Sequence, residues 1–141
     1  MAIDENYADL APGFVTSDLV KGSYEDTVME ANLDFQDDGI LIVKSKADKS
    51  YLAVLSWKVV DGVIHAKQFR FKDSNGIINS AAAVKECAKN ENLCALFTTR
   101  TYHVLKVTED DGLIMLRNMR VIFDNSNSNT SVQLHVLKKV E

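Results

Sequence analysis

YLAVLSWKVV-DG-VIHAKQFRFK, residues 51–72, is the clearest structural signal in this chain of 141 residues. Ten-residue runs rich in β-branched and aromatic side chains lie on either side of Asp61-Gly62. An Asp-Gly pair tolerates the positive φ angles that a tight hairpin turn requires. The segment therefore predicts a β-hairpin with strands at 51–60 and 63–72.

The same turn dipeptide occurs at two other places in the chain. Asp38-Gly39 and Asp111-Gly112 also lie between apolar, strand-like runs. At residues 28–36, apolar and polar side chains alternate, which is typical of a strand with one buried face. The expected strands are 28–36, 40–46, 51–60, 63–72, 93–99, 101–109, 113–124 and 131–140.

One helix is expected between the two groups of strands, at about 79–91. Asn79 or Ser80 can cap its start, and the following alanines at 81–83 favour helix. Short connections between consecutive strands favour antiparallel pairing. We therefore predict a mainly β (α+β) fold, an antiparallel eight-strand sandwich or barrel-like meander with this one central helix.

The N-terminal segment differs from the rest in charge. Residues 1–38 hold ten acidic residues and one basic residue, a net charge of −9, whereas residues 39–141 hold ten acidic and fifteen basic residues, a net charge of +5. Such asymmetry suggests an interaction segment. We predict an extended acidic arm at 1–22, followed by one β-rich domain at 23–141, with a helical turn within 16–27 that Ser23 and Asp26 would cap.

Large apolar residues are interleaved with the acids of this arm. They would anchor the arm on a partner surface while charge guides its approach. The predicted partner-binding anchors are Ile3, Tyr7, Leu10, Phe14 and Leu19.

Most catalytic signatures are absent from the sequence. There is no nucleophile elbow, phosphate loop or dinucleotide-binding glycine pattern. His65, His103 and His135 have no local metal-ligand spacing, and Cys87 and Cys94 are expected to be buried small hydrophobic residues in a reducing compartment. We expect no enzyme activity, no metal and no cofactor.

Two polar features stand out in the second half of the chain. Arg100, Tyr102 and His103 form a polar group that is a candidate anion site. Arg117 shares its strand parity with apolar residues, so a charge would fall in a buried stripe unless a β-bulge shifts the parity or an acid pairs with it.

Bases and aromatics alternate on the strand at 63–72. Lys67, Phe69, Arg70 and Phe71 form a candidate nucleic-acid strand, because exposed aromatics can stack on bases while cations hold phosphates. The simpler interpretation places Phe69 and Phe71 in the core. The net charge of −4 also argues against nucleic acid as a partner.

These observations lead to a hypothesis of a non-enzymatic interaction or assembly protein that docks through its acidic arm on another protein or on a second copy of itself. A viral (virion or phage) accessory structural role is the specific form of this hypothesis. The alternatives are a nucleic-acid-associated β module that uses the 63–72 strand, and a small acidic inhibitor that mimics a polyanion. The apolar runs are too short for a membrane helix, and a cytoplasmic (or virion) location is expected.

Overall fold

The fold is a closed barrel of eight antiparallel strands, seen in a computed structural model that describes residues 15–123 and 128–140. Each strand pairs with the next in the sequence, and β1 pairs with β8 to close the barrel. The strands are β1 (Gly22–Asp26), β2 (Ala31–Phe35), β3 (Ile40–Ser45), β4 (Tyr51–Val60), β5 (Val63–Phe71), β6 (Cys94–Val107), β7 (Leu113–Ile122) and β8 (Ser128–Val140). The predicted mainly β meander is thus confirmed, in its barrel form.

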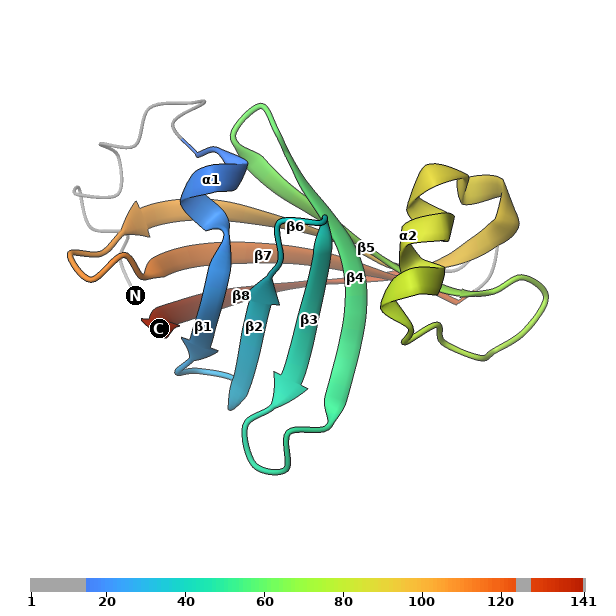
Figure 1. Ribbon diagram of the computed structural model, residues 1–141, viewed down its shortest axis with the longest axis horizontal. Coiled ribbons are helices and arrows are strands. Elements are labelled where there is room, and N and C mark those ends of the chain that lie inside the picture. The colour runs from blue at the N-terminus through green and yellow to red at the C-terminus, as the bar shows by residue number, and fades with distance from the viewer. Residues whose placement is uncertain (1–14, 124–127, 141) are drawn as a thin grey trace.

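The barrel is flattened into two crossing layers. Figure 1 shows β1–β4 running nearly at right angles to the long strands β6–β8 behind them. The hairpin predicted at 51–72 forms as β4 and β5, and Asp61 and Gly62 both have positive φ, at 51° and 79°. These angles match the turn that the Asp-Gly pair predicted.

The strand predictions contain two errors, a strand that was missed and a strand that was divided in two. Residues 22–26 form strand β1 rather than part of a capped helical turn, and Ser23 donates to Asp34 instead of capping a helix. The strands predicted at 93–99 and 101–109 are one continuous strand, β6. The correct total of eight strands therefore combines one missed strand with one that was divided in two.

The interior of the barrel holds the main hydrophobic core. Aromatic rings fill its centre, where Phe35 makes edge-to-face contacts with Tyr24, Trp57 and Tyr102 at centroid distances of 5.3–6.4 Å. Such edge-to-face pairs contribute about 0.5–1.5 kcal/mol each beyond their buried area. The short helix α1 (Ser17–Val20) adds Leu19 and Val20 to the same core, at the end of the barrel where β1 begins, and Val15 joins them from the segment before the helix.

The second helix, α2 (Ala81–Lys89), covers the outside of the barrel (Figure 1). The Ser80 side chain caps it by accepting a hydrogen bond from the Ala83 N–H group. Val84 and Cys87 are buried against outward-facing residues of β3, β4 and β5, among them Phe69. Gln68 and Phe69 face opposite sides, as neighbours in a strand do, and the register shift at this point leaves Phe97 of β6 without a partner in β5.

A disulfide joins Cys87 of α2 to Cys94 at the start of β6, beyond the 3-10 turn η2 (Glu91–Leu93). Both cysteines were expected to be free, so this expectation was wrong, although Cys87 is buried as predicted. None of the helices in the described ranges has the length and apolar character needed to cross a membrane.

Candidate functional site inside the barrel

A cavity of about 170 Å³ lies inside the barrel, toward the ends of β1 and β3. Its walls combine six small or aliphatic side chains with five that carry polar groups. The lining residues are Asp26, Met29, Ala31, Leu33, Val43, Leu52, Ala53, Arg100, Tyr102, Arg117 and His135. Met29 and Leu52 are half-exposed, so the cavity reaches solvent between the β1–β2 and β3–β4 turns. A mostly apolar cavity with a few converging polar groups is typical of a small-molecule site.

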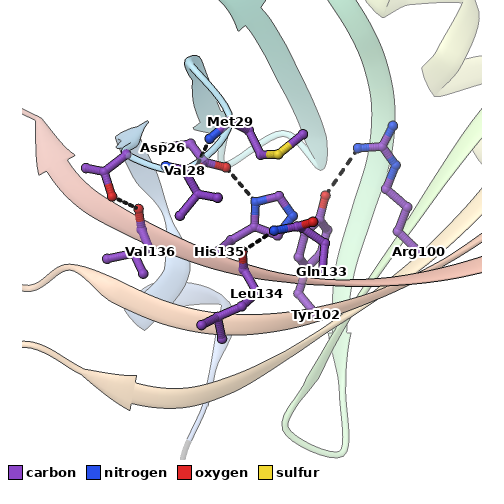
Figure 2. Close-up of polar contacts among 10 residues, drawn as sticks. Asp26, Val28, Met29, Arg100, Tyr102, Gln133, Leu134, His135 and Val136 are labelled. Atoms are coloured by element: carbon purple, nitrogen blue, oxygen red, sulfur yellow. Dashed lines mark hydrogen bonds and ion pairs between the residues drawn. The ribbon is translucent and has the colours of Figure 1, made fainter. Parts of the chain in front are cut away.

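Asp26 and His135 form a buried pair at this cavity (Figure 2). The Nδ1 atom of His135 lies 2.5 Å from Oδ2 of Asp26, and Oδ1 of Asp26 accepts hydrogen bonds from the N–H groups of Val28 and Met29. Burial alone would raise the pKa of Asp26, but the hydrogen bonds from His135 and the two N–H groups outweigh it and lower the pKa. Asp26 is therefore a carboxylate at neutral pH.

Arg100 and Arg117 bring two positive charges to the same cavity. A guanidinium N–H of Arg100 donates to the Tyr102 hydroxyl over 3.3 Å (Figure 2). Burial lowers the pKa of Arg117, and repulsion from Arg100 adds to this effect, while Tyr102 and Asp26 oppose it. Arginine nevertheless stays protonated in proteins. With one carboxylate and two guanidinium groups, the cavity carries one excess positive charge when His135 is neutral.

Three buried nitrogen atoms at the cavity have no hydrogen-bond partner among the described residues. They are Nε of Arg100, Nε of Arg117 and Nε2 of His135. A buried polar atom without a partner costs about 1–3 kcal/mol, so it needs an explanation. No other side chain in residues 15–123 and 128–140 has such an atom.

Arg117 is the charged residue that the sequence places in an apolar stripe. The pairing of β7 with β6 and β8 shows no register shift at this residue, so the parity is kept and its side chain faces inward. No salt bridge of Arg117 is found among the described residues, although Asp26 lines the same cavity. Neither of the two explanations offered by the sequence, a bulge or an ion pair with an acid, is found there.

The three side chains of the predicted anion group do not lie together, because successive side chains of β6 point to opposite faces of the sheet. Arg100 and Tyr102 point into the barrel, whereas His103 lies exposed on the outer face. Asp26 and His135 were not predicted as site residues. They lie 109 residues apart, so only the closure of the barrel through the β1–β8 pair brings them together.

The side chains of the candidate nucleic-acid strand likewise do not form one exposed surface. Phe69 is buried beneath α2 as expected, but Phe71 is 55% exposed, so the expectation that both rings would be buried was half wrong. Lys67 forms an ion pair with Glu91 over 2.6 Å, and Arg70 donates to the carbonyl oxygen of Phe123. This strand therefore presents a single exposed ring, not a row of them.

Of the predicted arm anchors, Leu19 lies in the described part of the chain and packs against the core of its own barrel. Ile3, Tyr7, Leu10 and Phe14 lie outside the described residues.

A larger groove of about 380 Å³ runs outside the barrel between α2 and strands β4 and β5. Four lysines line it, but Lys67 pairs with Glu91 and Lys85 pairs with Asp38 over 2.8 Å. No buried unpartnered polar atom of the described residues faces this groove. The interior cavity is therefore the stronger candidate for a ligand site.

Comparison with known proteins adds no assignment. No protein-family model, curated protein or solved structure matches this chain.

Proposed function

We propose that this protein binds a small organic anion inside its barrel, with a carboxylate as the recognised group. Support comes first from the two arginines, whose buried Nε atoms lack partners at a cavity with one excess positive charge. Guanidinium groups recognise planar carboxylates through paired N–H donors. An anion there would supply the missing acceptors and would offset the repulsion between Arg100 and Arg117.

The volume and the apolar walls of the cavity restrict the size and polarity of the part of the ligand that carries the carboxylate. A cavity of about 150 Å³ is known to hold one benzene molecule, and this cavity measures about 170 Å³. Its apolar walls, including Leu33, Val43 and Ala53, favour a compact hydrocarbon or aromatic body. An eight-stranded barrel has an interior suited to a single small ligand. A ligand with one ring and one carboxylate fits this description.

Titration calorimetry with benzoate tests the proposal. We expect wild-type protein to bind benzoate with a dissociation constant below about 1 mM, equivalent to about −4 kcal/mol. Arg117→Met should weaken binding at least tenfold, because it keeps an unbranched side chain and removes the guanidinium group. Lys85→Met, in the outer groove, is the matched control and should leave binding unchanged. Absence of binding by benzoate and by other small monocarboxylates would overturn the proposal.

The assembly role predicted from the acidic arm is a separate proposal. It is supported by the charge asymmetry of the sequence, and its anchors up to Phe14 lie outside the described residues. Docking of the arm and ligand binding in the barrel would use different parts of the chain, so each can be tested in the absence of the other.

A further inference from the structure

The Asp26–His135 pair is not explained by anion binding alone. A carboxylate ligand needs donors, which the two arginines supply, whereas the buried carboxylate of Asp26 reduces the positive charge of the cavity. A site selected only for anions would gain from an apolar residue in place of Asp26. The pair therefore points to a second feature of the ligand.

The surroundings of Asp26 fix the position of the proton on the imidazole. The carboxylate accepts from three donors, the N–H groups of Val28 and Met29 and the Nδ1 atom of His135. Because an ionised carboxylate can only accept, the proton of this contact lies on Nδ1. In the neutral imidazole, Nε2 then carries a lone pair and acts as a hydrogen-bond acceptor.

This acceptor faces the cavity without a donor. His135 is 4% exposed, its Nε2 atom is buried, and no described residue donates to it. The nearest ring is Tyr102, which stands edge-to-face with the imidazole at a centroid distance of 6.2 Å. The hydroxyl of Tyr102 accepts from Arg100, and its own O–H makes no hydrogen bond to Nε2, which has no partner among the described residues. A donor for Nε2 would thus come from the occupant of the cavity.

We infer that the ligand carries a hydroxyl group that donates to Nε2 of His135 while its carboxylate binds Arg100 and Arg117, which makes it a small hydroxy-substituted carboxylic acid. A hydroxyl fits better than an ammonium group, because the excess positive charge of the cavity repels a cation. This inference rests on the proposed anion-binding function. It adds selectivity, because a site that hydrogen-bonds a ligand hydroxyl discriminates strongly against the analogue that lacks it.

The test compares matched ligands at pH 8.5. The probes are benzoate, 3- and 4-hydroxybenzoate, and the corresponding fluorobenzoates, in which fluorine is close to a hydroxyl in size but cannot donate. We expect at least one hydroxybenzoate to bind tenfold or more tightly than both benzoate and its own fluoro analogue. In His135→Phe, the affinity ratio between each hydroxybenzoate and its fluoro analogue should fall to about one, whatever the change in benzoate affinity.

A measurement on the wild-type protein removes the dependence on how well that variant folds. In ¹⁵N-histidine NMR spectra at pH 8.5, Nε2 of His135 should resonate as an unprotonated nitrogen and should shift with the hydroxybenzoate but not with the fluoro analogue. Equal affinities for the hydroxyl and fluoro ligands, or a protonated Nε2 in the free protein, would overturn the inference and leave anion binding standing. If no benzoate derivative binds at all, both the proposed function and this inference fail.

Discussion

Asp26 and His135 are joined side chain to side chain at 2.5 Å although 109 residues separate them in the chain. Asp26 ends β1 and His135 lies in β8, the two strands whose pairing closes the barrel. The pair is thus both part of the candidate site and a contact across the closing seam. Its loss should affect stability as well as ligand selectivity.

Asp26→Asn should lower the free energy of unfolding at pH 7 by about 1.5–3 kcal/mol, the range for losing a hydrogen bond to a charged group. The pKa of Asp26 is lowered in the folded protein, below the value near 3.9 of an unfolded chain. The ionised carboxylate therefore stabilises the fold above about pH 4, and this contribution is lost as the pH falls through the folded pKa.

Urea denaturation of both proteins from pH 7 to pH 2.5 measures this difference. The gap between wild type and Asp26→Asn should narrow below about pH 4. Asp37→Asn, at an exposed position, is the control and should change stability by less than about 0.5 kcal/mol. A gap that stays constant down to pH 2.5 would contradict the role of the ionised carboxylate.

Arg117→Met should raise the stability of the free protein, by about 1–3 kcal/mol, because it removes a buried polar atom without a partner. The same substitution weakens benzoate binding, so stability and function should change in opposite directions. Thermal unfolding with and without benzoate measures both effects. Arg120→Met, exposed on the same strand, should be close to neutral, and a destabilised Arg117→Met would show that Arg117 has a structural partner.

Replacing both cysteines, as Cys87→Ala with Cys94→Ala, should lower the free energy of unfolding by about 2–3 kcal/mol, the loop-closure value for a bridge this short. Benzoate affinity should not change, because α2 and the disulfide lie outside the barrel wall. Denaturation curves and calorimetry on the same samples separate the two effects. A loss of affinity in the folded double variant would mean that α2 shapes the interior cavity.

The effect of an N-terminal deletion on stability should depend on whether it extends past residue 15. Removing residues 2–14 should leave the barrel folded, whereas removing residues 2–20 should cost several kcal/mol, since Val20 is fully buried and its carbonyl oxygen accepts a 2.6 Å hydrogen bond from the Tyr24 hydroxyl. The acidic arm predicted at 1–22 therefore ends in residues that the barrel itself needs.

Sedimentation of the shorter deletion tests the assembly proposal. If the arm mediates self-association, removal of residues 2–14 should reduce the sedimenting mass of the wild-type protein at equal concentration. An unchanged mass in a protein that does associate would contradict docking through the arm.

The parts of the fold that the sequence predicted are those with local signals. The β4–β5 hairpin has its turn dipeptide and both strands within residues 51–71, and α2 has its cap and alanines within a single segment. Strand β1 has only five residues, and half of its pairing comes from β8. The sequence of residues 22–26 does not indicate that this strand pairs with β8.

The site was predictable only in fragments. Arg100 and Tyr102 were found because they lie close together in the sequence, in one polar group with His103, and Arg117 stood out as a charge in an apolar stripe. Asp26 and His135 look unremarkable in their own strands. Their meaning depends on which strands meet when the sheet closes, and local spacing carries no information on that.

The β1–β8 pairing has a consequence for the order in which the molecule matures. Residues Ser23 and Val140 are register partners, so the seam cannot close before the chain has been synthesised as far as β8. Until then, a nascent sheet exposes two open edges, which are the surfaces most prone to pair with other chains. Contacts between segments so distant in sequence also form slowly. Strand β8 therefore completes the sheet, and any chain that ends before it would leave the edge of β1 open to pairing with other chains.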